Sequence, residues 1–69
     1  MNKSVIMLIQ KAETGNADSQ NQLGDAYYDG IGIEQDHAKA FEWYLRAAEQ
    51  GHGKAQYNVA YAYANGIGT

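Results

Sequence analysis

Two segments of this 69-residue chain repeat one another at a distance of 36 residues. Segments 12–33 and 48–69 are identical at nine of their 22 aligned positions, and a weaker match relates residues 3–9 to residues 39–45. A fixed period of about 20 to 50 residues is typical of proteins built from stacked units, each of which buries its apolar face against a neighbour. We therefore predict a single repeat module over residues 1–69. Its parts are the second half of one repeat (1–14), a full repeat (15–50) and a partial repeat (51–69).

Helical signals occur in every part of the repeat. Apolar residues between Val5 and Ala12 follow the i, i+3, i+4, i+7 spacing of one helix face. Gly15 and its equivalent Gly51 stand where helices often end in a left-handed residue, and Asp36 is a favourable N-cap. We expect helices over residues 4–13, 17–28, 37–49 and 53–64. Because nothing alternates with a period of two, the predicted fold is an all-α solenoid of antiparallel helix pairs with four helices and no strands.

The predicted core lies on the inner face of each helix. Its residues are Val5, Leu8, Ile9 and Ala12, then Ser19, Leu23, Ala26 and Tyr27, then Ala40, Phe41, Tyr44, Leu45 and Ala48, and finally Ala55, Val59, Ala62 and Tyr63. The first and last helices each lack one neighbour within this sequence. We expect Val59 and Tyr63 to be covered by further repeats of the same protein or by another copy of the chain.

The composition of the chain limits how it can be stabilised and which kinds of partner it can bind. Cysteine is absent, so a chain this short depends on packing or on a partner for its stability. Eight acids against five bases give a net charge of -3, which argues against nucleic acid or an anionic membrane surface as partner. The apolar run 5–9 is shorter than the about 7–15 residues of a secretory signal. If the chain is complete, we expect a cytoplasmic protein with no membrane contact.

Short motifs add a family resemblance. Leu23-Gly24-Asp25-Ala26-Tyr27 matches the L-G-x-x-Y core of a tetratricopeptide-type helix pair, although Gln20 replaces the Trp of that pattern and the period is 36 rather than about 34 residues. The other motifs are Ala48-Glu49-Gln50-Gly51, Ala55-Gln56, Gly30-Ile31-Gly32-Ile33, Asp36, Lys39-Ala40, Trp43-Tyr44 and Ala47-Ala48. Together these motifs make nearly the whole chain resemble the Sel-one-like repeat family, with mild departures at Ser19, Ala60 and Thr69.

The resemblance implies a non-enzymatic scaffold or adaptor that binds a protein or peptide and needs no cofactor. In stacked helix pairs the first helix of each pair lines the concave face. The candidate protein-binding residues there are Asn21, Asp25 and Tyr28 in one repeat, Tyr57 and Tyr61 in the next, and Gln22 and Asn58 beside them. Tyrosine suits such contacts because it offers a large area and a hydrogen-bonding tip at low entropy cost. Either these residues bind a partner, or Tyr57 and Tyr61 only pack against neighbouring helices.

Other candidate sites are weaker. The Gly30-Ile31-Gly32 loop lacks the preceding strand and the Gly-Lys-Ser/Thr of a phosphate loop, so we interpret it as a turn. His37 and His52 have no partners at metal-ligand spacing, and Ser4 and Ser19 have no base arranged to activate them. We therefore predict no catalytic, cofactor-binding or metal-binding residues.

Two alternative functions stay open at this point. One is self-assembly into a homo-oligomer through the uncovered terminal helices. The other follows from the resemblance, because some secreted relatives have been linked to β-lactam binding or hydrolysis. Those relatives rely on repeats joined by disulfides, whereas this chain has no Cys and no Ser-x-x-Lys motif.

Overall fold

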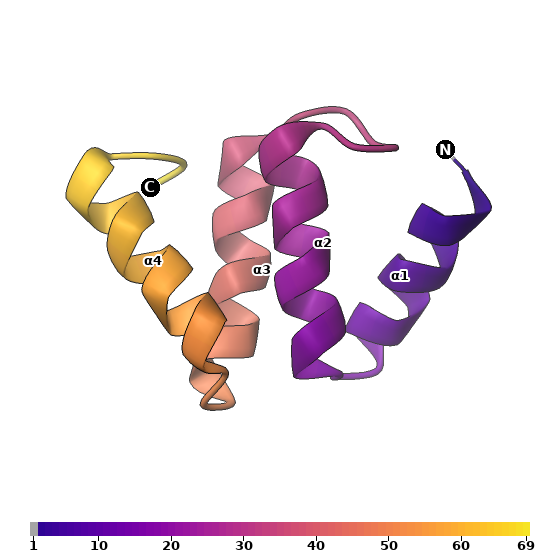
Figure 1. The fold of residues 1–69 in the computed structure, drawn as a ribbon, viewed down its shortest axis with the longest axis horizontal. Coiled ribbons are helices and arrows are strands. Elements are labelled where there is room, and N and C mark those ends of the chain that lie inside the picture. Colours follow the sequence, from indigo (N-terminus) through magenta and orange to yellow (C-terminus); the bar gives the residue numbers. More distant parts are fainter. Residues whose placement is uncertain (1) are drawn as a thin grey trace.

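The computed structural model describes residues 2–69, which form four α-helices joined by short turns (Figure 1). The helices are α1 Lys3–Glu13, α2 Ala17–Asp29, α3 His37–Glu49 and α4 Gly53–Asn65. Each predicted helix is confirmed, with ends that differ from the prediction by at most one residue, and residues 2–69 contain no strand. Met1, which we assigned to the first half-repeat, lies outside the described residues.

A side chain caps the N-terminus of each of these helices. Asn2, Asn16, Asp36 and His52 each accept a hydrogen bond from the backbone N–H three residues later, over 2.8 to 3.1 Å. Such a bond satisfies one of the N–H groups that a helix start leaves without a partner, and it is worth about 1 kcal/mol. His52 stands 36 residues after Asn16 and performs the same task through its Nδ1 atom. The local sequence therefore marks where each helix begins.

The four helices stack in one layer, each antiparallel to the next (Figure 1). α1 packs on α2, α2 on α3 and α3 on α4, and the body measures 33 × 23 × 13 Å. Contacts of this kind, mainly between successive helices, are those of a helical solenoid. The predicted all-α solenoid is confirmed.

The repeated glycine pattern ends two of the helices. Gly30 ends α2 and Gly66 ends α4, with φ angles of 69° and 63°, in the left-handed region that favours glycine. The N–H groups of Ile31 and Ile67 then bond back to the carbonyl oxygen five residues earlier, over 3.0 and 2.9 Å. The Gly30-Ile31-Gly32 loop is therefore a helix-ending turn, as predicted.

Small side chains dominate the core. Leu23 is fully buried at the centre of α2. The other buried apolar residues are Val5, Ala12, Ala26, Ala40, Tyr44, Ala47, Ala55 and Ala62. Only Ala47 among them was not predicted. The α2 and α3 helices pack closely where Gly24 meets Tyr44, because a Cβ added to Gly24 would lie 2.5 Å from Cε1 of Tyr44.

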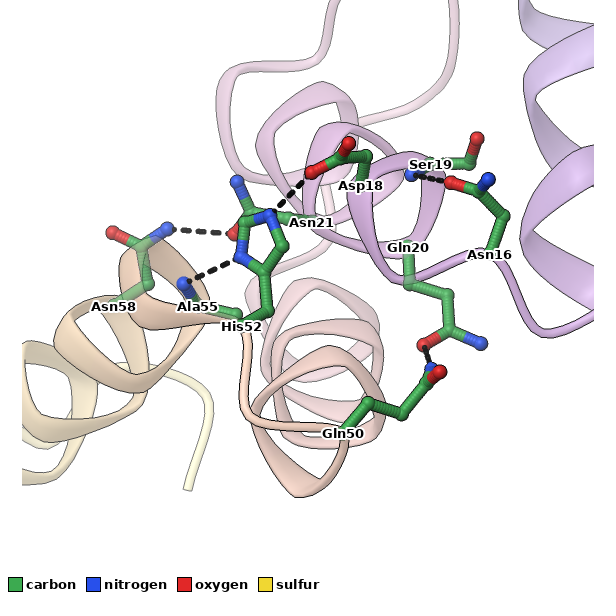
Figure 2. Close-up of polar contacts among 9 residues, drawn as sticks. All are labelled: Asn16, Asp18, Ser19, Gln20, Asn21, Gln50, His52, Ala55 and Asn58. Atoms are coloured by element: carbon green, nitrogen blue, oxygen red, sulfur yellow. Dashed lines mark hydrogen bonds and ion pairs between the residues drawn. The ribbon is translucent and has the colours of Figure 1, made fainter.

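A buried glutamine fastens successive helices together. Gln20, which is 5% exposed, donates from Nε2 to the carbonyl oxygen of Ala12 over 3.0 Å. Its Oε1 accepts a hydrogen bond from Nε2 of Gln50 over 2.8 Å (Figure 2). One repeat later, Gln56 donates in the same way to the carbonyl oxygen of Ala48 over 3.3 Å. The identity of Gln20 and Gln56 therefore has a structural reason that the sequence alone did not reveal.

Tyr63 has the spacing of an inward-facing residue but is not buried here, which agrees with the expectation that a further repeat or another copy is needed to cover it. Its side chain is 62% exposed, because within residues 2–69 no helix covers that side of α4. The Tyr63 ring still meets Phe41 edge-on, with ring centroids 5.1 Å apart. At the other end of the stack, Ile6 and Met7 of α1 are 44% and 55% exposed. Both ends of the layer thus present apolar side chains to solvent.

Candidate functional site

Two polar contacts tie α2 to α4 near the N-terminal ends of both helices. Nε2 of His52 lies 2.7 Å from Oδ1 of Asp18, and Nδ2 of Asn58 donates to Oδ1 of Asn21 over 3.0 Å (Figure 2). Beyond these contacts α4 leans away from α2, with α3 between them (Figure 1). The divergence opens a groove whose floor is the first half of α3.

The groove encloses about 290 Å³. It is lined by Asp25, Tyr28 and Asp29 of α2, by His37, Ala40, Phe41 and Tyr44 of α3, by Tyr57, Asn58, Tyr61 and Ala62 of α4, and by Ile67 of the following turn. Aromatic walls with a few polar groups are the usual composition of a binding pocket. We refer to this site as the α2–α4 groove.

Aromatic rings form two stacked pairs at the rim of the groove. Tyr57 and Tyr61 lie one helical turn apart on α4, with ring centroids 6.5 Å apart and planes inclined by 28°. They are 69% and 48% exposed. On the opposite wall, Tyr28 stacks on His37 with centroids 4.7 Å apart. Exposed stacked rings provide a large apolar contact area without first having to unpack from the core.

One hydrogen bond joins the floor of the groove to its α2 wall. The hydroxyl of Tyr44 donates to Oδ1 of Asp25 over 2.6 Å. Burial raises the pKa of the Tyr44 phenol above its ordinary value, and the hydrogen bond to the negatively charged Asp25 raises it further. Tyr44 therefore stays protonated and acts as the donor to Asp25 at the edge of the groove.

Five of the seven candidate residues from the sequence come together in this groove. They are Asp25, Tyr28, Tyr57, Asn58 and Tyr61. The stripe predicted along α2 and α4 is thus one continuous surface here. Whether it binds a partner stays a prediction.

The other two candidate residues are placed differently. Asn21 is only 6% exposed, and its carboxamide oxygen accepts the hydrogen bond from Asn58 of α4. Its predicted place on the exposed stripe is wrong, and it acts as a support beneath the groove. Gln22 is exposed but lines a different, more polar hollow between α1 and α2, together with Met7 and Lys11.

Seven of the twelve lining residues were not chosen from the sequence as candidates, and four of these seven have aromatic or charged side chains. Phe41 and Tyr44 carried a helical core signal, and Tyr44 is indeed buried, yet both also form the groove floor. Asp29 was not among the candidates, and His37 was considered only as a possible metal ligand. Asp29 is the last residue of α2 and His37 is the first residue of α3. The turn between these helices brings both residues to the same groove, and the sequence alone does not show this.

The histidines have structural partners in this fold. His37 stacks on Tyr28, and His52 caps α4 while contacting Asp18. Among residues 2–69, no group of three or more His, Cys, Asp or Glu side chains is placed to hold a metal ion. In the same range, no helix combines the length and apolar character that crossing a membrane requires.

Comparison with known proteins identifies the repeat. The Sel1 repeat family matches residues 17–52 and 53–69. The chain is 39% identical over 57 residues to the ERAD-associated E3 ubiquitin-protein ligase component HRD3A of Arabidopsis thaliana, covering 83% of this chain and 8% of the relative. It is 40% identical over 66 residues to protein sel-1 homolog 2 of Mus musculus, covering 94% of this chain and 10% of the relative. The chain thus spans about a tenth of the length of these curated relatives.

Solved structures show the same fold. The Sel1 repeat protein from Oxalobacter formigenes has a TM-score of 0.92 and 40% identity, over 94% of this chain and 27% of that one. A protective antigen of uropathogenic Escherichia coli strains that displays an SLR fold has a TM-score of 0.91 and 41% identity, over 99% of this chain and 15% of the antigen. Identity at this level supports the helical repeat and the family together.

Proposed function

The chain belongs to the Sel1 repeat family, and from this premise we propose that it is a non-enzymatic binding module that holds a segment of a partner protein in the α2–α4 groove. One curated relative is by name a component of a ubiquitin ligase, that is, a member of a protein assembly. A role in assembling proteins is therefore the function that we carry over to this chain.

The exposed Tyr57–Tyr61 pair beside the groove is the observation that supports this proposal most directly. Both rings are already solvent-exposed and held one turn apart, so a partner gains contact area without unfolding any part of the module. The groove is partly open to solvent, which suits a segment of a partner chain that inserts a side chain better than an enclosed small molecule.

The test starts from a displayed peptide library selected on the immobilised chain. The affinity of a selected peptide is then measured for the wild type, for the double variant Tyr57→Ala/Tyr61→Ala and for Ile31→Ala. Ile31 is 65% exposed and lies outside the groove, so it is a matched control for the loss of a large exposed side chain. We expect the tyrosine variant to lose binding by about tenfold or more while Ile31→Ala binds as the wild type does.

Circular dichroism provides the folding control for this experiment. Tyr57 and Tyr61 carry little buried surface, so the helix content of the double variant should equal that of the wild type. Unchanged peptide affinity in a folded double variant would rule out the proposed groove.

Self-association is a second candidate function, because the two exposed ends of the layer match one another. Leu8 of α1 is the repeat equivalent of Tyr44, and Ala60 of α4 is the equivalent of Gly24. If α1 of one copy packed on α4 of another as α3 packs on α2, Leu8 would face Ala60. The contact of a large side chain with a small residue would then be repeated between the two copies. Leu8 and Tyr61 would occupy the places that the hydrogen-bonded Tyr44 and Asp25 occupy within one copy.

Sedimentation velocity from micromolar to millimolar concentration tests this candidate. Head-to-tail contacts of this kind extend into chains, so we expect the average mass to rise steadily with concentration. The variant Met7→Glu, which places a charge on the exposed face of α1, should reduce the rise. A folded wild-type monomer at every concentration would exclude self-association.

A further inference from the structure

The lining of the α2–α4 groove carries two carboxylates and several aromatic rings, and its one basic side chain, His37, is stacked on Tyr28. Asp25 and Asp29 are its charged groups, and its rings come from Tyr28, Phe41, Tyr44, Tyr57 and Tyr61. Neither Lys nor Arg is among the twelve lining residues. A negative, aromatic site favours a cation, because the faces of the rings and the carboxylates both attract positive charge.

We infer that the groove receives the side chain of an arginine of the partner segment, a refinement that rests on the proposed function. Asp25 and Asp29 are four residues apart and therefore share one face of α2. Tyr44 donates to Oδ1 of Asp25, so Oδ2 keeps its lone pairs for a donor from the partner. The five N–H donors of a guanidinium can serve both carboxylates at once.

The chain's lysines and its arginine do not line this site. Nζ of Lys39 lies 5.6 Å from the centre of the Tyr27 ring, and Cζ of Arg46 lies 4.4 Å from the centre of the Trp43 ring. None of these four residues lines the groove. The same molecule therefore already uses cation–ring contacts elsewhere, while the rings of the groove have no cation of their own above them in the described residues.

Size and shape favour arginine over lysine. A volume of about 290 Å³ is at the small end of the roughly 300–1,000 Å³ of ligand pockets, which fits one long side chain better than a whole folded element. The guanidinium is planar and weakly hydrated, so it stacks on rings such as Tyr57 and Tyr61 at lower desolvation cost than an ammonium. The aliphatic part of the side chain would lie along Phe41 and Ala62.

The first experiment uses three small probes on the full 69-residue chain. N-acetyl-arginine amide, N-acetyl-lysine amide with a free side-chain amine, and the neutral analogue N-acetyl-citrulline amide are titrated while NMR follows the tyrosine ring signals. Citrulline has nearly the shape of arginine without its charge. We expect arginine to bind about tenfold more tightly than citrulline, more tightly than lysine, and more weakly as salt is added. Equal affinities for arginine and citrulline, or for arginine and lysine, would overturn the inference.

The second experiment removes the carboxylates one at a time. Asp25→Asn keeps an oxygen that can accept from Tyr44, and Asp29→Asn is equally conservative in shape. Each should weaken arginine binding several-fold, and the double variant should bind arginine and citrulline alike. Glu34→Gln, which removes an exposed charge outside the groove, should leave arginine binding unchanged. An equal loss from Glu34→Gln would show that net charge alone attracts the probe and would contradict the site.

The library experiment separates this inference from the proposed function. Selected peptides without arginine that still depend on Tyr57 and Tyr61 would overturn the arginine inference and leave the groove as a binding site. Failure of any peptide to depend on the tyrosines would overturn the proposed function itself. Enrichment of arginine at one peptide position, lost in the Asp25→Asn/Asp29→Asn variant, is the result that we expect.

Discussion

The hydroxyl of Tyr44 on α3 and the carboxylate of Asp25 on α2 are joined by a hydrogen bond of 2.6 Å at the floor of the groove. Tyr44 also fills the space that the missing side chain of Gly24 leaves on α2. One residue thus connects the packing of the α2–α3 pair with the charge at the edge of the binding groove.

The hydrogen bond should contribute measurably to stability. Tyr44→Phe keeps the ring in place but removes the donor, so we expect the free energy of unfolding to fall by about 1 kcal/mol. Urea unfolding followed by circular dichroism measures the change. Tyr57→Phe is the matched control, since the Tyr57 side chain is 69% exposed, and it should have no effect. Equal stability of Tyr44→Phe and the wild type would mean that this hydrogen bond makes no net contribution to the free energy of unfolding.

The raised pKa of Tyr44 predicts a loss of stability in alkali. Its pKa is raised above the ordinary tyrosine value of 10.0 in the folded chain, so the protonated phenol is favoured by folding. The stabilisation is fully present below that unfolded value and is lost as the pH rises beyond it, because only the unfolded chain then releases the proton easily. Urea unfolding from about pH 8 to about pH 11 should show the wild type losing more stability than Tyr44→Phe. Parallel losses in the two proteins would assign the alkaline effect to other groups.

Gly24→Ala tests the close approach of α2 and α3. Alanine is the better helix former by about 1 kcal/mol, but its Cβ would lie 2.5 Å from Cε1 of Tyr44. Because the buried Tyr44 ring cannot move aside freely, overpacking should win, and we expect a net loss of about 1–3 kcal/mol.

Gly53→Ala is the matched control for that variant. Gly53 is also in a helix, yet a Cβ there would meet no atom within 4 Å. Unfolding by urea should therefore show no loss of stability, or a slight gain, for Gly53→Ala. If Gly24→Ala were as stable as Gly53→Ala, the Tyr44 ring would be able to move aside at no measurable cost, and the overpacking expected at Gly24 would be contradicted.

The sequence predicted the helices well because each one carries local signals. Apolar spacing marks the face that packs inward, and glycines such as Gly30 mark where helices end. The burial of small residues such as Ala40 and Ala55 followed from the same spacing. These features depend on residues close in the chain, which a single sequence displays.

The errors concern contacts between helices. Spacing of i, i+4, i+7 places Asn21 on one face with Asp25, but it does not say that Asn58 of α4 covers part of that face. Tyr63 has the spacing of a core residue, yet a core position is buried only where a neighbouring helix exists. The hydrogen bonds of Gln20 were not predicted, because its partners Ala12 and Gln50 meet only after α1, α2 and α3 have stacked.

His52 should fix where α4 begins, and its contact with Asp18 should hold the N-terminal end of α4 close to α2. Its Nδ1 accepts the N–H of Ala55 over 3.1 Å, and its Nε2 lies 2.7 Å from Oδ1 of Asp18 (Figure 2). His52→Ala removes both contacts, so we expect a loss of about 1 kcal/mol or more in the free energy of unfolding. His52→Asn should recover most of that loss, because asparagine caps helices well and already does so at Asn16. Since the Asp18 contact is absent in both variants, hydrogen exchange at the N-terminus of α4 should be faster in His52→Ala than in His52→Asn. Equal exchange and equal stability in the two variants would show that the cap contributes nothing and that only the contact with Asp18 matters.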